Sequence, residues 1–311
     1  MNTESNLLRE SEVDSETAAT ASLPETQPLY WSVRRELWEN RWIYVGQLAI
    51  AAVCLFGFLI SIARWLARMH GLATTNPAKY WETVALPYNV VAGVMMVTLI
   101  LMSLFYSADA LYSERRDRSI LFWKSLPVSD LTTVLAKASI PLVILPVVTI
   151  AITLATHLIM LLLSSIVLPA NGVSLASWWK GLSIVQMWGL LIYHVLTAHA
   201  LWPFPAYCWL LLVSGWARRA PLLWAALPVV AIAGLEKLVF HTSYFAAAVG
   251  SRFIGAGAPT AFTAGDMFPT DPMTHITPGR FLGAPGLWIG FAVAAVFLTA
   301  AVRLRRYRDP V

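Results

Sequence analysis

Residues 87–107, PYNVVAGVMMVTLILMSLFYS, form an apolar run of 21 residues that contains no charged side chain. A helix of that length rises about 30 Å, which matches the hydrocarbon thickness of a lipid bilayer. The same character pervades the chain, because 58% of its 311 residues are hydrophobic and only 13% are charged. Soluble domains are about 25% charged on average, so this composition indicates a membrane protein.

On either side of this run, five others have comparable length and composition. We predict six membrane spans, at about 43–63, 87–107, within 138–168, within 182–213, and at about 221–240 and 284–302. Buried helices of a large soluble core are the alternative, and six runs of this length with so few charges argue against it. The predicted fold class is therefore an all-α integral membrane protein with six transmembrane helices.

Lys and Arg residues are unevenly distributed among the loops that six spans create. If both termini lie on one side, that side carries fifteen of the 22 Lys and Arg residues and the other side carries seven. Because positively charged loops stay in the cytoplasm, we expect both termini and the loop between the second and third spans to be cytoplasmic. The net charge of +5 is explained in this way, so no nucleic-acid partner is expected.

The two ends of the chain are expected to lie outside the spans. Residues 1–28 contain six Asp and Glu residues against a single Arg, and nothing in them can bury a core. We therefore predict a disordered, acidic cytoplasmic tail there. Residues 303–311 are predicted to be a basic cytoplasmic C-terminus.

Residues 29–42, LYWSVRRELWENRW, are predicted to form a helix that lies in the membrane interface before the first span. On this helix the aromatic and aliphatic residues share roughly one half, whereas Glu36 lies with Glu39 and Arg35 on the other half. Arginines on the apolar half can extend their charged ends to lipid phosphates. A longer first span with an aromatic belt is the alternative. The side chains assigned to the interface are Trp31, Arg34, Leu37, Trp38 and Arg41.

Prolines interrupt two of the predicted spans. Pro203 and Pro205 remove backbone donors within the fourth span, which should kink or split there. The third span begins with Pro141 and Pro146 and is longer than a perpendicular crossing needs, so it should tilt or extend past the bilayer.

Segment 241–283 is the longest connection expected outside the membrane, and it is rich in Gly, Ala, Pro and Phe. We favour a re-entrant or interfacial hairpin, which requires that the segment pack against protein. An ordinary exposed loop is the alternative, and the apolar composition argues against it.

No residue pattern in the chain indicates a catalytic or cofactor site. The dipeptide Gly-Lys is absent, so the chain has no Walker A loop for nucleotide. The spans contain no Asp or Glu except Glu236, which we interpret as a charge at a helix end rather than an ion-coupling site. We predict that the chain is not an enzyme and has no cofactor of its own.

Histidines and cysteines within the spans are interpreted as packing residues. His194 and His199 point about 140° apart around a straight helix, so they would not bind one metal ion together. These two residues and His157 are more typical of polar side chains bonded across helices, with a haem or copper role as the weaker alternative. Cys54 and Cys208 have neither the spacing of a disulfide framework nor that of a metal site.

The loop between the second and third spans has an unusual sequence, ERRDRSILFWKSLPVSD at 114–130. Its first five residues are all charged, and the arginines, Arg115 among them, should lie at the lipid headgroups. An apolar knob follows at 120–123. This knob can rest in the membrane interface or fill a groove on a cytoplasmic protein.

Helices are expected on both sides of the knob. The second span can continue as a helix to Asp117, and Pro127 ends the short helix that carries the knob. Ser129 or Asp130 can cap the next helix, which leads into the third span. Because a passive loop needs neither cap nor knob, we favour presentation to a protein partner.

Residues 116–130 resemble the first cytoplasmic loop of bacterial ABC-2 type transporter permeases, which carries the block R-D-x-S-I-L-F-W-K-S-L-P-V-S-D. The rest of the resemblance is architectural and covers about 29–305: an interfacial helix, six spans, both termini inside and an apolar outer segment, as in type V exporters. The resemblance implies that 108–137 is a coupling loop that docks in a groove of an ATPase. The residues that it implies for this role are Arg116, Asp117, Ser119, Ile120, Phe122, Trp123, Lys124, Leu126 and Pro127.

The same resemblance implies partners and a function. The chain would be a permease subunit of the bacterial cytoplasmic (inner) membrane, forming a homodimer that binds two cytoplasmic ABC ATPase subunits. Those partners would hold ATP and Mg, and their closure would drive export of amphiphilic or hydrophobic cargo. The alternative is a membrane subunit without transport activity, a sensor or an assembly factor on which a partner ATPase does mechanical work.

Overall fold

The computed structural model describes residues 26–307, with gaps at 74, 120–127, 182–183 and 255–275. Within that part of the chain the backbone forms helices and no strand, so the predicted all-helical fold is confirmed. The elements are α2 (Thr26–Glu39), α3 (Trp42–Ala73), α4 (Pro77–Asp109), α5 (Tyr112–Arg116), α7 (Asp130–Ser139), the π-helical segment η1 (Ile140–Ile144), α8 (Leu145–Ala170), α9 (Leu175–Gly181), α10 (Ile184–His194), the π-helical segment η2 (Val195–Leu201), α11 (Phe204–Trp216), α12 (Pro221–Phe240), α13 (Tyr244–Ile254), α14 (Pro278–Leu282) and α15 (Pro285–Tyr307). Most of the predicted acidic tail, the apolar knob and the middle of segment 241–283 lie outside the described residues.

Six helices among the described residues are long and apolar enough to cross a membrane, as the sequence predicts. They cover Trp42–Leu72, Lys79–Arg116, Asp130–Ala170, Ile184–Leu201, Pro221–Phe240 and Pro285–Tyr307. The first three are longer than the predicted spans, because the helices continue into more polar residues. At 1.5 Å per residue the third extends about 60 Å, roughly twice what a crossing requires.

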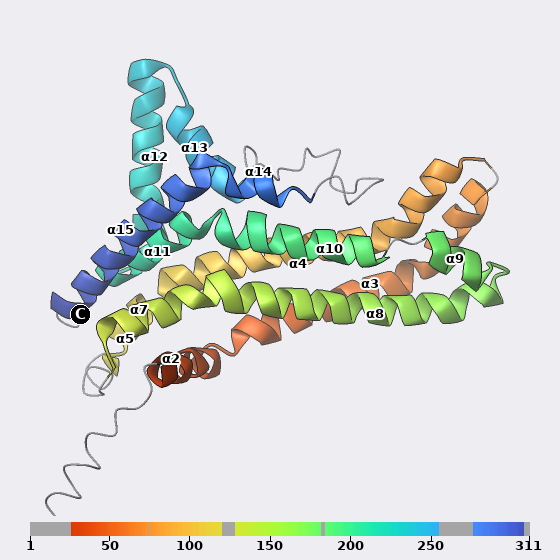
Figure 1. The fold of residues 1–311 in the computed structure, drawn as a ribbon, viewed down its shortest axis with the longest axis horizontal. Coiled ribbons are helices and arrows are strands. Elements are labelled where there is room, and N and C mark those ends of the chain that lie inside the picture. Colours follow the sequence, from red (N-terminus) through yellow and green to blue (C-terminus); the bar gives the residue numbers. More distant parts are fainter. Residues whose placement is uncertain (1–25, 74, 120–127, 182–183, 255–275, 308–311) are drawn as a thin grey trace, which may run out of the picture.

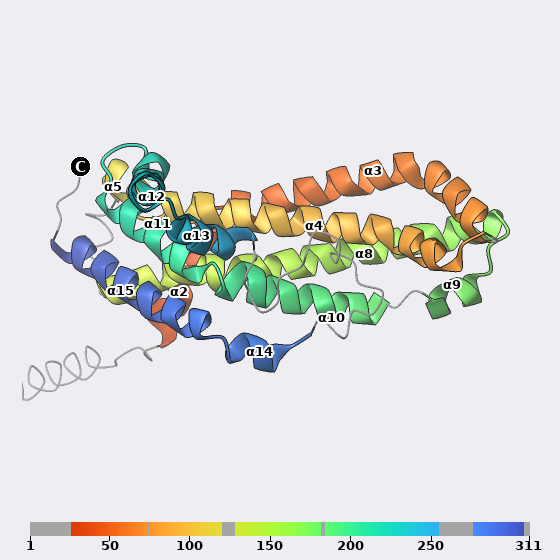
Figure 2. The ribbon, with the colours of Figure 1, turned by 90° about the horizontal axis from the view of Figure 1, so that it is seen from above.

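The long helices α3, α4, α8 and α10 run side by side along the longest axis of the molecule (Figures 1 and 2). At one end, which we call the loop end, lie α2, α5, α7 and the last turns of α15. The opposite end holds α9 and the turn between α3 and α4, where the Asn76 side chain caps α4 by accepting a hydrogen bond from the Lys79 amide at 3.2 Å. Helix α12 leaves the bundle at a steep angle, with α13 beside it.

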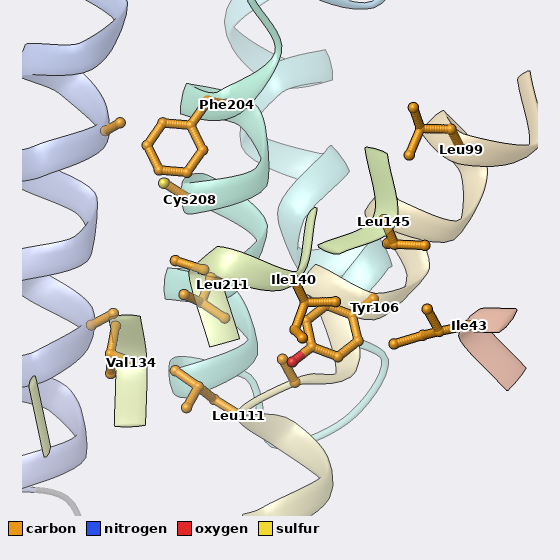
Figure 3. Close-up of a cluster of buried hydrophobic side chains, with 14 of the residues drawn as sticks. Ile43, Leu99, Tyr106, Leu111, Val134, Ile140, Leu145, Phe204, Cys208 and Leu211 are labelled. Carbon is orange, nitrogen blue, oxygen red and sulfur yellow. The ribbon is translucent and has the colours of Figure 1, made fainter. Parts of the chain in front are cut away.

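The largest buried apolar cluster lies near the loop end (Figure 3). It brings Ile43 of α3, Tyr106 of α4 and Leu145 of α8 together with Cys208 and Leu211 of α11. Burial of side chains of this size stabilises a structure by about 1.5–3 kcal/mol each in a soluble reference. The helices that flank the loop are therefore joined to the best-packed part of the molecule.

Proline marks both departures from regular α-helix. The segment η1 forms just before Pro146, whose ring nitrogen has no proton to donate to the preceding turn. The segment η2 ends in a turn at Trp202 and Pro203, after which α11 begins with Pro205 in its first turn. The predicted fourth span is thus divided into α10 with η2 and the shorter apolar helix α11.

Candidate functional site

The described parts of the loop begin and end in helices. After a turn at 110–111, α5 carries the chain out from α4, and Arg118, two residues beyond this helix, has a positive φ of 57°. On the return side, the Ser129 hydroxyl caps α7 by accepting a hydrogen bond from the Thr132 amide at 3.0 Å. The loop is therefore held between two ordered ends.

Of the residues implied for ATPase coupling, the structure describes three, which are Arg116, Asp117 and Ser119. Arg116 and Asp117 are exposed and pair with each other, with 2.9 Å between Arg116 Nε and Asp117 Oδ1. Ser119 is half-buried, and its hydroxyl donates to the Glu114 carbonyl at 3.3 Å. The other residues implied for this role, Ile120, Phe122, Trp123, Lys124, Leu126 and Pro127, lie outside the described residues.

Arg115 is buried, so the prediction that it lies at the lipid headgroups is wrong. Its Nη2 donates to the carbonyls of Ser214 at 2.8 Å and Ala217 at 2.6 Å, at the C-terminal end of α11. Free carbonyls at a helix C-terminus attract a cation, which explains why this arginine turns inward. The start of the loop is therefore fastened to α11.

A cluster of charged side chains lies beneath the loop, and we call it the charge network. Its members are Arg35, Glu36, Glu114, Asp130, Lys137 and Arg305. Lys137 lies between two carboxylates, with its Nζ 2.8 Å from Glu36 Oε1 and 3.1 Å from Glu114 Oε1. Both Glu36 and Lys137 are almost fully buried, with side chains 1% and 2% exposed.

Two arginines complete the charge network. Arg305 near the end of α15 pairs with Glu114 and donates from Nε to Asp130 Oδ1 at 3.0 Å. Arg35 of α2 donates from Nη2 to Glu36 Oε1 at 2.9 Å and to Glu114 Oε1 at 3.2 Å. Glu114 precedes the knob and Asp130 follows it, so the network joins both sides of the loop to α2 and α15.

Glu36 is held in the charged form by its neighbours. Burial by itself would raise its pKa, but Lys137 and Arg35 outweigh that effect and hold the pKa below the ordinary value of 4.5. The Tyr106 hydroxyl donates to the second carboxylate oxygen of Glu36 at 2.8 Å. Glu36 therefore lies inside the protein, because its carboxylate packs against Lys137 of α7 and Tyr106 of α4.

The other half of α2 is exposed and aromatic. The Arg34 guanidinium lies 5.1 Å from the ring centre of Trp31, and that of Arg41 lies 6.0 Å from the ring centre of Trp38. Leu37 is half-buried and packs against the main apolar cluster. Helix α2 begins three residues earlier than predicted and ends at Glu39, so Arg41 lies in the turn before α3.

A polar cavity of about 310 Å³ opens between α2 and the start of the loop. Its walls include the carboxylates of Glu39, Asp109 and Asp117 in addition to members of the charge network. The wall of this cavity therefore carries more carboxylates than cations, and residues of the loop itself contribute to it.

The histidines within the spans have hydrogen-bond partners in the protein. His157 lies 3.0 Å from the Tyr88 carbonyl through Nε2 and accepts from Trp188 Nε1 at 3.3 Å, so it links α8 to α4 and α10. His194 and His199 each contact a backbone carbonyl of their own helix. In the part of the chain that the structure describes, no group of three or more His, Cys, Asp or Glu side chains is placed to hold a metal ion.

No single segment of the sequence predicts the charge network, but the sequence of α7 indicates part of it. Asp130 and Lys137 are seven residues apart and therefore share one face of a helix. That face also carries Val134, which is fully buried, so both charges had to meet partners inside the protein.

Comparison with family models, curated proteins and solved structures finds no match for this chain. The family resemblance of residues 116–130 therefore stays a prediction. The function must be argued from those residues and from the geometry of the loop end.

Proposed function

We propose that the chain is the membrane-spanning permease subunit of an ATP-binding cassette transporter, with two copies worked by two separate ATPase subunits. In this proposal the loop end faces the bacterial cytoplasm, both termini are cytoplasmic, and the transporter exports amphiphilic or hydrophobic cargo. The observation that supports it best is that both sides of loop 114–130 are fastened to one buried charge network. A loop fastened in this way passes a force on its tip to the helices behind it.

The first step is docking of the knob. Phe122 and Trp123 are large aromatic residues in a loop that carries seven charged residues, and such aromatic residues act as anchors in grooves of partner proteins. ATP and Mg are bound by the ATPase, since this chain has no Walker A sequence. Closure of the ATPase subunits then pulls on the loop.

The second step is transfer of that movement into the membrane helices. Lys137, which follows the loop, pairs both with Glu114 at the start of the loop and with Glu36 of α2. Separating buried partners of this kind costs about 3–5 kcal/mol, so the segments move together rather than apart. Helix α2, with its exposed aromatic half, would shift along the membrane surface as the loop moves.

The test is reconstitution in liposomes with a candidate ABC ATPase, which would be sought among the neighbouring reading frames. We expect ATP hydrolysis by the complex, none by this chain alone, and ATP-driven export of fluorescent amphiphilic dyes that survives a protonophore. A strict requirement for a proton gradient would contradict the proposal. Hydrolysis that responds to another membrane protein and never to a dye would instead indicate a mechanical role without transport.

A further inference from the structure

A second cavity, of about 590 Å³, lies between α11, α12, α13 and α15. Apolar side chains form nearly all of its wall, including Trp209, Val229, Phe245 and Phe297. Arg252 is the one charged residue among the residues that line it. Cavities of roughly 300–1,000 Å³ with apolar walls and a few polar groups are typical of binding sites for small molecules.

Helix α13, which carries Arg252, is held at its start by a carboxylate. Glu236 near the end of α12 accepts hydrogen bonds from the Tyr244 amide at 2.7 Å and the Phe245 amide at 2.9 Å. A carboxylate at a helix N-terminus satisfies amides that have no partner within the helix. Helix α13 then returns beside α12 for about 15 Å (Figure 1), so this part of segment 241–283 packs on protein.

Near the other end of α13, the guanidinium of Arg252 occupies a space that Gly290 leaves open, and Gly286 leaves room for the Trp202 ring beside it. A Cβ atom on Gly290 would lie 2.9 Å from Arg252 Nη1, and one on Gly286 would lie 3.2 Å from the Trp202 ring. Arg252 lies 4.4 Å from the centre of that ring and donates to the carbonyls of Trp202 at 3.2 Å and Gly286 at 2.8 Å. The cation is thus positioned by α15 and by the break before α11.

The charge of Arg252 is not neutralised by these contacts. Both acceptors are neutral carbonyls, and within the described residues no carboxylate lies within 4 Å of this guanidinium. An arginine has five N–H donors, and these two bonds engage only part of them. A guanidinium that lines an apolar cavity and meets neutral carbonyls is stabilised further by a negative charge, so the site favours an anionic ligand.

The mouth of the cavity opens beside α12, which is scarcely covered by protein. Ala225 is the buried residue among the described residues of this helix, whereas Val230 in the cavity wall is 68% exposed. An exposed apolar helix that is long enough to cross a membrane faces lipid. The molecules with access to the cavity are therefore those of the bilayer.

We propose that this cavity binds an anionic phospholipid of the surrounding membrane, with its phosphate on Arg252 and an acyl chain along the apolar wall between α11 and α12. The positive charge of Arg252 favours an anionic headgroup, and the apolar wall packs against the acyl chain. The proposal does not depend on the transport function, because it concerns this chain alone.

The test is native mass spectrometry of the full chain in mild detergent, with phosphatidylglycerol, phosphatidylcholine or oleate added at equal concentration. We expect at least threefold higher occupancy by phosphatidylglycerol than by phosphatidylcholine. Arg252→Gln should abolish that preference, whereas Arg280→Gln, which removes an exposed cation of α14, should leave it intact.

Arg252 also holds α13 in place, so a loss of binding in Arg252→Gln can also come from a folding defect. A second variant therefore leaves Arg252 unchanged. Ala226→Trp fills the cavity without touching Arg252 and should lower phospholipid occupancy at least threefold. Ala231→Trp on the exposed side of the same helix should leave occupancy unchanged. Equal binding of the two phospholipids, a preference that survives Arg252→Gln, or retention of oleate alone would each overturn the proposal.

Discussion

The charge network and the α12–α13 hairpin both use charged side chains to hold segments in place, but they do so differently. In the network, cations and carboxylates from α2, α5, α7 and α15 neutralise one another within the chain. In the hairpin, Glu236 meets backbone amides and a hydroxyl, and Arg252 meets backbone carbonyls. The first arrangement fixes helices to one another, whereas the second fixes one short helix and leaves a charge available to a ligand.

The two regions also differ in how much protein covers them. Five residues of α7 are buried, including Lys137, although this helix is only ten residues long. Helix α12 has twice that length and a single buried residue, Ala225. We infer that the loop end moves as one body, whereas lipid covers part of the surface of α12 and α13 that protein leaves exposed.

The largest effect is expected from Lys137→Met, which removes the cation between two buried carboxylates. The loss in free energy of unfolding should be about 3–5 kcal/mol, because Glu36 and Glu114 would remain buried and repel each other. Unfolding by sodium dodecyl sulfate in mixed micelles measures it. Lys79→Met, at an exposed position on α4, is the control and should change stability little. Equal effects of both variants would show that the network does not stabilise the loop end.

Acid should weaken the same network. The pKa of Glu36 is lower in the folded chain than its ordinary value of 4.5, so its contribution to stability is present above that pH and is lost as the pH falls further. The groups that face Glu36 are Arg35, Lys137 and Tyr106. Unfolding measured between pH 7 and pH 3 should show a steeper loss in the unmodified chain than in Glu36→Gln. Parallel curves would refute this assignment.

A smaller effect is expected from Arg115→Ala, which removes two charge-assisted hydrogen bonds to α11. Such bonds contribute about 1.5–3 kcal/mol, so thermal unfolding should shift measurably. Arg116→Ala changes the neighbouring arginine, which is exposed, pairs with Asp117 and lies 5.7 Å from the ring centre of Tyr112, and should have no measurable effect. If the two variants unfolded indistinguishably, Arg115 would not be bonded to α11 and would instead lie at the membrane surface.

The smallest effect is expected in the hairpin, from Glu236→Gln. A neutral amide is a weaker acceptor for the amides of Tyr244 and Phe245, so the start of α13 should open more often. Hydrogen exchange of those two amides should become several-fold faster, while exchange in α7 stays the same. Unchanged exchange at both amides would mean that Glu236 does not hold the hairpin.

Local sequence predicts elements whose beginning and end are chemically marked. Helix α12 has the predicted bounds, because Pro221 begins it and His241 ends it with a positive φ of 52°. The cap at Ser129 is a similar case, since its side chain acts on an amide three residues away. Such features depend on neighbours in the chain and need no knowledge of the fold.

The charge network could not be predicted in the same way, because its members come from residues as far apart as 36 and 305. A helical wheel of α2 shows that Glu36 lies opposite the aromatic residues, but it cannot show whether water or Lys137 faces it. Arg115 was misplaced for the same reason, since its partners are the last carbonyls of α11. Composition alone assigns these charged residues to the surface, but they lie inside the protein because they pair with residues far away in the sequence.

We propose that the knob at 120–123 couples this chain to an ATPase. The most direct measurement compares copurification of the ATPase with the Phe122→Ala, Trp123→Ala double variant and with a Trp38→Ala, Leu131→Ala control. The control removes an aromatic and an aliphatic residue that are 67% and 54% exposed at the same end of the molecule. We expect the double variant to insert normally and lose the ATPase, at about 1–4 kcal/mol for each buried anchor, while the control retains it. Full copurification and full transport by the double variant would contradict the claim.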